Sequence, residues 1–161
     1  MREHEGERVN TVGEVCRKLK KNKASFRIVY SWNGEIDPEL DFDLVCKAVN
    51  ACKQMTLVIE EVSLYCSPSR IPTTLSKIVG QGRHSNLGII CTSQTPKQIN
   101  PFLRSQAGRI ISFSQTEPGH IEWCKAVMGA EAEKLPKLKP FECLDWSPEL
   151  CIVRDRNFDP V

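Results

Sequence analysis

The sequence predicts an α/β domain of three layers, in which helices cover both faces of a mainly parallel sheet. Three observations lead to this fold class. Strand-like and helix-like segments alternate along most of the chain, which is the order that builds a parallel sheet. The run 56–59 (Thr-Leu-Val-Ile) has no charge and suits a strand buried on both faces. Two strand-like segments end in polar residues, where open α/β sheets bind ligands.

Composition is that of an ordinary globular protein and excludes few functions. The 161 residues fit one domain, with 40% hydrophobic and 26% charged residues. The net charge of +2 argues neither for nor against a nucleic-acid partner. No apolar run approaches the roughly 18 residues that span a membrane, and residues 1–8 are charged and lack an apolar signal segment. We therefore expect a cytoplasmic protein without membrane contact.

Cysteine usage points to the same compartment. The eight cysteines include no C-x-x-C pair, and most lie within apolar or helical patterns. A metal site or a disulfide framework is the alternative that such a number raises. We expect instead small buried hydrophobic side chains in a reducing cytosol.

The first part of the chain predicts two helices and a strand before the uncharged run. Residues 1–10 are polar and are expected to be flexible. A helix is predicted over 11–23 from helically spaced apolar residues, with Thr11 and Glu14 spaced to cap its start. Residues 26–32 read as a strand, and a helix over about 40–53 leads into the run 56–59.

The alternation continues after an irregular stretch at 62–72. A helix is predicted to begin near Pro72 and to fail at 80–82, which leaves Arg83 in an exposed turn. The remaining predicted elements are strands over 87–94 and 108–113, helices over 98–106 and 117–128, a short helical turn at 130–134, and two short edge strands, 141–145 and 150–154, that suit a hairpin.

Two acids directly follow the uncharged run. Glu60 and Glu61 stand where the strand is predicted to end, and neighbouring strand residues point to opposite faces of a sheet. In phosphate-transferring enzymes this position provides one carboxylate for the magnesium shell and another to orient water. The alternative is a strand that ends in two solvated acids.

The order of these segments resembles the HerA–FtsK class of P-loop ATPases, and within it the DNA-packaging and plasmid- or virus-borne members. The resemblance covers about residues 26–145. It rests on the segment 56–62 (Thr-Leu-Val-Ile-Glu-Glu-Val), which is similar to a Walker B motif, and on 82–96, which ends in Thr-Ser-Gln-Thr-Pro. It implies a RecA-like core, with ATP and Mg²⁺ as cofactors.

The resemblance also implies roles for individual residues. Glu60 takes the magnesium-associated Walker B position, where many relatives have Asp, and Glu61 that of the catalytic carboxylate. Gln94 takes the position of a polar sensor of the terminal phosphate, with Thr92 and Ser93 beside it. The structural alternative for Gln94 is a residue that makes hydrogen bonds at a strand end.

Arg83 is the best candidate for an arginine finger that completes a neighbouring subunit's site. The alternative is a solvated loop arginine. A finger of this kind implies ATPase subunits in a homo- or hetero-oligomeric ring. A DNA partner follows from the resemblance alone.

One motif of the class is absent. Gly-x-x-x-x-Gly-Lys-[Ser/Thr], whose N–H groups and lysine hold phosphates, occurs nowhere, and the nearest run, 80–83 (Gly-Gln-Gly-Arg), lacks the lysine. Residues 11–161 are therefore expected to form a single partial ATPase core whose P-loop strand lies upstream. That strand belongs beside the segment ending in Gln94, so without it this segment and the strand at 109–113 either close up or leave two unpaired edges and an apolar slot, which favours association. We expect these 161 residues alone to bind ATP poorly.

Three functions remain at this point. The chain is the C-terminal part of an ATP-hydrolysing motor domain for DNA translocation or packaging, and supplies the Walker B, sensor and finger positions. Alternatively it is a non-catalytic remnant or regulatory partner that docks on intact ATPase subunits. The assembly-type ATPases of filamentous viruses share the layout, but they usually add a membrane segment, which the sequence does not contain. Whether the chain is an enzyme is open.

Overall fold

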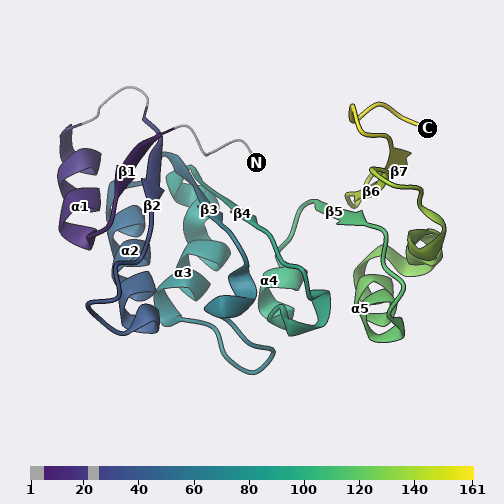
Figure 1. Cartoon of the computed structure of the whole chain (residues 1–161), viewed down its shortest axis with the longest axis horizontal. Coiled ribbons are helices and arrows are strands. Elements are labelled where there is room, and N and C mark those ends of the chain that lie inside the picture. Colours follow the sequence, from purple (N-terminus) through teal and green to yellow (C-terminus); the bar gives the residue numbers. More distant parts are fainter. Residues whose placement is uncertain (1–5, 22–25) are drawn as a thin grey trace. The chain divides into compact units, whose positions relative to one another are not determined.

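The computed structural model describes residues 6–21 and 26–161, and the chain divides into two compact units (Figure 1). Unit 1 comprises Met1–Cys66 and Arg70–Thr92, and unit 2 comprises Ser67–Ser69 and Ser93–Val161. Each unit has its own strands and helices and is described separately below.

Unit 1 contains two parallel strand pairs and three helices that lie side by side (Figure 1). Its elements are β1 (Glu7–Val9), α1 (Val12–Lys21), β2 (Ile28–Tyr30), α2 (Pro38–Cys52), β3 (Met55–Ile59), the 3₁₀ turn η1 (Val62–Leu64), α3 (Thr73–Gln81), the 3₁₀ turn η2 (Gly82–Ser85) and β4 (Leu87–Cys91). β1 pairs with β2, and β3 pairs with β4 in the register Met55 to Leu87 through Ile59 to Cys91. β1 was not predicted from the sequence, and the end of the predicted helix 11–23 lies outside the described residues.

Local capping explains where the helices of unit 1 begin. The Glu14 backbone N–H donates to Thr11 Oγ1 at 3.3 Å, and Glu14 Oε2 accepts from the Asn10 N–H at 3.1 Å. This confirms the predicted pairing of Thr11 with Glu14 at the start of α1. Asp37 Oδ1 accepts from two N–H groups in the first turn of α2, each at 3.0 Å, and Pro38 suits the first helical position.

The β3–β4 pair has one buried and one exposed face. Ile59 is 3% exposed, and the buried apolar residues of unit 1 lie mostly on α2, α3 and the ends of this pair: Phe42, Val45, Cys46, Val49, Val62, Leu75, Ile78 and Leu87. Val58 and Ile90 are cross-strand partners, so they share the other face, and they are 57% and 54% exposed. Parallel strands are normally covered on both faces, so an uncovered apolar face is unusual.

Unit 2 is built around an antiparallel sheet, β5-β6-β7. Its elements are the 3₁₀ turn η3 (Pro96–Gln98), α4 (Pro101–Ser105), β5 (Ile110–Phe113), α5 (Pro118–Met128), the 3₁₀ segment η4 (Gly129–Lys137), β6 (Cys143–Trp146) and β7 (Cys151–Arg154). Its core joins α5 and η4 to the central strand through Cys124, Met128, Ala132, Leu135 and Leu144. The predicted hairpin is confirmed as β6 and β7.

The pairing of β5 differs from the prediction. The strand predicted at 108–113 was placed in a mainly parallel sheet, whereas β5 pairs antiparallel with β6, from Ile110 opposite Trp146 to Phe113 opposite Cys143. The hairpin brings β6 back against β5, and Leu144, which is fully buried, anchors β6 in the core. The chain is therefore a mixed α/β protein whose described strands form three small sheets. β6 is a central strand, and of the two predicted edge strands only β7 lies at an edge.

The predicted helix over 98–106 is shorter than expected and begins later. Proline has no N–H to donate, and Pro101 is the first residue of α4. Asn100 Oδ1 accepts from the Phe102 N–H at 3.0 Å and caps this start. Among the described residues, none of the helices has both the length and the apolar composition of a membrane span.

Candidate functional site

The carboxyl ends of β3 and β4 meet at one edge of unit 1, and Thr92 links them. The Thr92 backbone N–H donates to the Ile59 carbonyl at 3.0 Å, and the Thr92 carbonyl accepts from the Val62 N–H at 2.9 Å. Thr92 Oγ1 also accepts from the Glu61 N–H at 3.2 Å. Glu60 and Glu61, which we call the acid pair, lie in the turn that these three hydrogen bonds hold. Two of the bonds involve the Thr92 backbone and one its side chain.

Glu61 lies in a backbone conformation that L residues seldom adopt. Its φ of 49° and ψ of 67° are left-handed, which is uncommon for a residue other than glycine, asparagine or aspartate. The Ser63 hydroxyl donates to Glu61 Oε1. Residues in such conformations persist where the surroundings over-determine them, and they concentrate at functional sites. Here Thr92 and Ser63 supply those surroundings.

Glu60 is exposed and follows the last residue of β3. Since β3 ends at Ile59, the strand alternation invoked for the two acids does not extend to them, and the left-handed turn at Glu61 sets their directions instead. A carboxylate at a strand end suits Mg²⁺, which is commonly held by one or two carboxylates, phosphate oxygens and water. The described residues contain no group of three or more His, Cys, Asp or Glu side chains that suits a metal.

The segment 92–94, predicted to be the sensor, begins in one unit and ends in the other. Thr92 is the last residue of unit 1, and Ser93 and Gln94 begin the second stretch of unit 2. Ser93 Oγ accepts from the Thr95 N–H at 3.2 Å, which shapes the turn after the segment. The structure thus brings Thr92 to the acid pair. The roles of Ser93 and Gln94 remain predictions.

Arg83 lies at the amino-terminal end of the β3–β4 pair, and the acid pair lies at its carboxyl-terminal end. Arg83 is exposed in η2, directly before β4, and the neighbouring Ser85 carbonyl accepts from the Gln54 N–H at 3.0 Å, just before β3 begins. Five strand residues separate the two ends, which is a distance of about 16 Å at 3.3 Å per residue. Arg83 is therefore remote from the acid pair of its own chain, and its role stays a prediction.

Sequence reasoning missed the supporting role of Ser63 and the side-chain contribution of Thr92. Ser63 stands in the irregular stretch 62–72, where serine is common and carries no special signal. The order Glu-Glu-Val-Ser could have suggested it, because a hydroxyl two residues after a carboxylate can reach back to it.

Comparison with known proteins identifies the fold. No protein-family profile matches the chain, and no curated protein sequence is significantly similar to it. Solved structures of the genome packaging NTPase B204 from Sulfolobus turreted icosahedral virus 2 match at 18–19% identity, over 97% of this chain and 74–75% of that one. Their TM-scores are 0.74 with ATP-gammaS and 0.75 with AMPPCP. The DNA-packaging ATPase B204 from Sulfolobus turreted icosahedral virus matches at 19% identity, over 85% of this chain and 68% of that one, with a TM-score of 0.66. The chain therefore shares its fold with viral genome-packaging ATPases.

Proposed function

We propose that this chain is part of the motor domain of a DNA-packaging or DNA-translocating ATPase and supplies its catalytic carboxylates. Glu60 holds the magnesium ion, Glu61 orients the attacking water, and Thr92, Ser93 and Gln94 contact the terminal phosphate. Arg83 acts on the site of a neighbouring subunit. The P-loop motif is absent from the 161 residues. The P-loop segment that binds the phosphates, which we call the cradle, is therefore contributed by another polypeptide segment.

The hydrogen bonds of Thr92 are the observation that carries this proposal. They fix a left-handed glutamate at the shared carboxyl edge of two parallel strands, which is where open α/β sheets bind ligands. Maintaining this conformation costs about 1–2 kcal/mol, and the hydrogen bonds from Ser63 and to Thr92 offset that cost. The fold likeness to proteins solved with ATP-gammaS and AMPPCP supports a phosphate ligand.

The uncovered face of the β3–β4 pair supports a cradle from outside. Val58 and Ile90 lie exposed on this face, and burying two such side chains contributes about 1.5–3 kcal/mol each. On the same face Thr56 and Gly88 are cross-strand partners, and a Cβ at Gly88 would lie 2.9 Å from Thr56 Oγ1. The Thr56 side chain therefore fills the space over Gly88 on this face. About a quarter of each B204 chain solved with these analogues lies outside the match.

A second function is favoured by the missing P-loop itself. A chain without a phosphate cradle can use the same apolar face to dock on intact ATPase subunits and regulate them. The two functions differ in one respect, because only the first leads to hydrolysis when a cradle is supplied.

A Val58→Asp substitution tests the proposal in a chain that carries a cradle. A synthetic strand–P-loop–helix segment with Gly-x-x-x-x-Gly-Lys-Thr is fused ahead of Met1 through a Gly/Ser linker, and Mg²⁺–ATP binding is followed by isothermal titration. We expect micromolar binding by the fusion and none by the chain alone. Val58→Asp should weaken binding by the fusion at least about tenfold, because a charge on the packing face costs more than about 1.4 kcal/mol.

Leu40→Asp is the matched control, since Leu40 is 52% exposed on the first turn of α2. It should leave binding unchanged. Micromolar, Mg²⁺-dependent binding by the 161 residues alone would overturn the proposal. If the fusion gains neither binding nor hydrolysis but the chain co-purifies with intact B204 subunits, the docking function is correct instead.

A further inference from the structure

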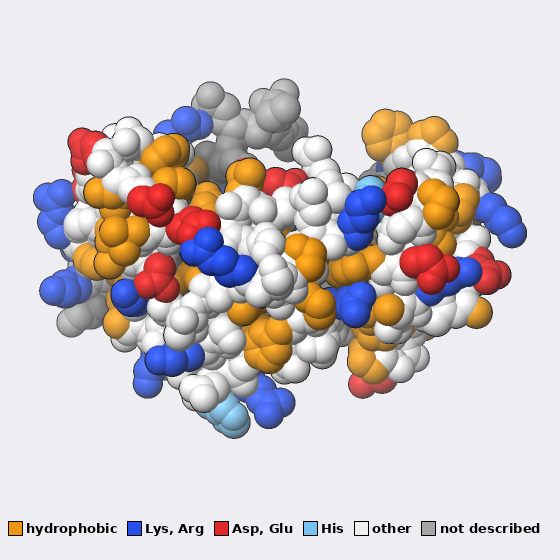
Figure 2. Space-filling view, turned by 90° about the horizontal axis from the view of Figure 1, so that it is seen from below, with side chains coloured by type: hydrophobic (Ala, Val, Ile, Leu, Met, Phe, Trp, Pro, Cys, Tyr) orange, Lys and Arg blue, Asp and Glu red, His pale blue; other side chains and the backbone are white. Residues whose placement is uncertain are grey.

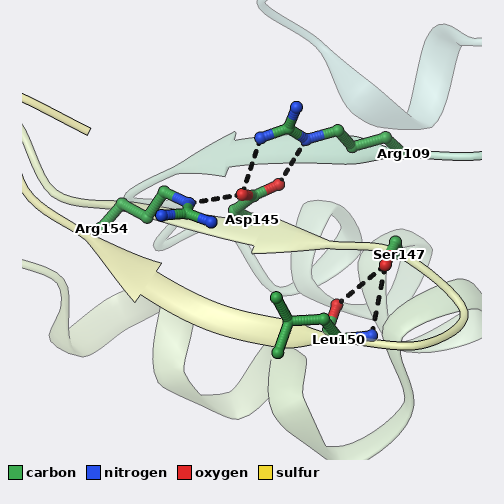
Figure 3. Close-up of a pocket in the computed structure, with 5 residues that line it drawn as sticks. All are labelled: Arg109, Asp145, Ser147, Leu150 and Arg154. Atoms are coloured by element: carbon green, nitrogen blue, oxygen red, sulfur yellow. Dashed lines mark hydrogen bonds and ion pairs between the residues drawn. The ribbon is translucent and has the colours of Figure 1, made fainter. Parts of the chain in front are cut away.

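Unit 2 contains two adjoining hollows with different linings, neither of which belongs to the acid-pair site. The first has a volume of about 320 Å³ and is lined by Arg109, Asp145, Ser147, Leu150 and Arg154 (Figure 3). The second has a volume of about 270 Å³ and is lined by Phe113, Phe141, Cys143, Asp155, Arg156 and Phe158. We call them the arginine hollow and the phenylalanine hollow. Figure 2 shows hydrophobic side chains beside Lys and Arg at the surface of unit 2.

In the arginine hollow, two guanidinium groups converge on one carboxylate (Figure 3). Arg109 donates from Nε and Nη2 to the two oxygens of Asp145 at 2.7 and 2.8 Å, and Arg154 Nε donates to Oδ2 at 2.5 Å. Asp145 is 5% exposed and neutralises only one of the two cations. The Arg109 side chain is 53% exposed. An excess positive charge is thus presented to solvent by a group whose orientation is fixed.

Phe158 joins the two hollows. Its ring lies 5.2 Å from the Arg109 guanidinium carbon and 4.8 Å from that of Arg154, and its carbonyl accepts from Arg154 Nη1 at 3.1 Å. The same residue lines the phenylalanine hollow. One aromatic ring therefore contacts both cations and forms a wall of the neighbouring apolar space.

The phenylalanine side chains are displayed at the surface rather than buried. Phe113, Phe141 and Phe158 are 60%, 73% and 40% exposed. Phe141 and Phe158 also have φ values of 68° and 70°, a left-handed conformation that is a true outlier for a bulky residue. The tail that carries Phe158 is held in place, because the Val161 N–H donates to the Val153 carbonyl at 3.0 Å. The fold thus maintains two strained residues whose rings are exposed around one hollow.

We propose that the two hollows together bind a nucleotide, with the base against the phenylalanine rings and a phosphate on the N–H groups of the half-exposed Arg109 that do not donate to Asp145. Bases stack on exposed aromatic rings without regard to sequence. Guanidinium groups form charge-assisted hydrogen bonds with phosphate oxygens. An apolar partner alone would not use the arginine hollow, and a free anion would not use the phenylalanine hollow. Free mononucleotide and single-stranded DNA share this chemistry.

Fluorescence anisotropy with two probes tests this proposal: a short labelled oligodeoxythymidine and a labelled ATP, each in EDTA. Without a divalent ion the metal-dependent acid-pair site does not contribute, so failure here leaves the proposed function standing. We expect at least one probe to bind the full chain. Phe141→Gly, which also relieves the left-handed strain, and Arg109→Gln should each weaken binding about tenfold, as loss of one stacking or one phosphate contact does.

Lys137→Gln is the control for charge, since Lys137 is exposed at the end of η4, and thermal melting checks that each variant is folded. Binding of the oligonucleotide alone identifies single-stranded DNA as the source, and binding of both probes identifies any nucleotide. The proposal is overturned if neither probe binds. It is also overturned if Phe141→Gly has no effect while Arg109→Gln and Lys137→Gln weaken binding equally. Loss of self-association in Phe141→Gly without loss of probe binding would make the hollow an interface between copies.

Discussion

Glu61→Gln is expected to lower the ATP hydrolysis rate of the cradle-fused chain by about 100-fold or more. The amide has the size of the carboxylate that it replaces. It carries no negative charge and cannot accept a proton from the attacking water. The hydrogen bond from the Glu61 N–H to Thr92 involves the backbone, so the variant keeps the turn. Mg²⁺–ATP affinity should therefore stay within about threefold, a difference of under 1 kcal/mol.

Steady-state phosphate release measures this effect, and two further substitutions serve as a control and a comparison. Glu35→Gln alters an exposed acid in the loop before α2 and should leave the rate unchanged. Glu60→Gln should instead raise the magnesium concentration needed for half-maximal rate, because Glu60 is assigned to the metal. Equal rates for Glu61→Gln and the unsubstituted fusion would remove Glu61 from the reaction. A loss of affinity equal to the loss of rate would make it a binding residue.

Asp145→Asn is expected to lower the unfolding free energy of unit 2 by about 2–3 kcal/mol at neutral pH. The amide keeps the shape but not the charge, so the guanidinium groups of Arg109, just before β5, and Arg154, at the end of β7, lose their common partner. Arg109 is half exposed and regains water. The expected loss therefore falls below the 3–5 kcal/mol typical of a fully buried pair.

The same contacts predict how this stability depends on pH. Hydrogen bonds from Arg109, and secondarily from Arg154, lower the pKa of Asp145 from 3.8 to about 2. A lowered pKa in the folded state stabilises the protein above the unfolded value and loses that contribution as the pH falls. The unfolding free energy should thus drop between about pH 4 and pH 2 in the unsubstituted chain. The drop should be smaller in Asp145→Asn.

Urea unfolding at several pH values checks both statements. Trp123 and Trp146 report on unit 2 if Trp32, which lies in unit 1, is first replaced by phenylalanine. Asp159→Asn changes an exposed acid of the C-terminal tail and serves as the control. Equal acid sensitivity in Asp145→Asn and the control would contradict the assignment of this contribution to Asp145.

The sequence predicted the elements better than their pairing. Capping at Thr11 and the hairpin of β6 and β7 are local signals, and both appear where they were expected. Strand pairing depends on residues far apart in the chain, so the antiparallel partner of β5 was not predictable from its own composition. β1 was missed because its three residues, Glu7–Val9, are mostly charged.

Part of the candidate site could also be predicted from the sequence. Adjacent parallel strands end at one edge, so the meeting of Thr92 with the acids follows from the predicted strands and is observed. The left-handed turn at Glu61 was not predictable, because glutamate gives no signal for that conformation and its supports are a long-range hydrogen bond and Ser63. Arg109, Asp145 and Arg154 were not singled out, because Arg109 is 36 residues from Asp145 and reaches it only through the unpredicted pairing of β5 with β6.

Paramagnetic relaxation by Mn²⁺–ATP tests most directly whether the acid pair lies beside a nucleotide phosphate. Backbone amide signals of the ¹⁵N-labelled cradle-fused chain are recorded with Mn²⁺–ATP and with diamagnetic Mg²⁺–ATP. We predict the strongest broadening at Glu60, Glu61 and Thr92, weaker broadening at Arg83 of the same chain in the monomer, and none at the acid pair in the unfused 161 residues. Unbroadened signals at Glu60 and Glu61 in a fusion that binds Mn²⁺–ATP would contradict the account.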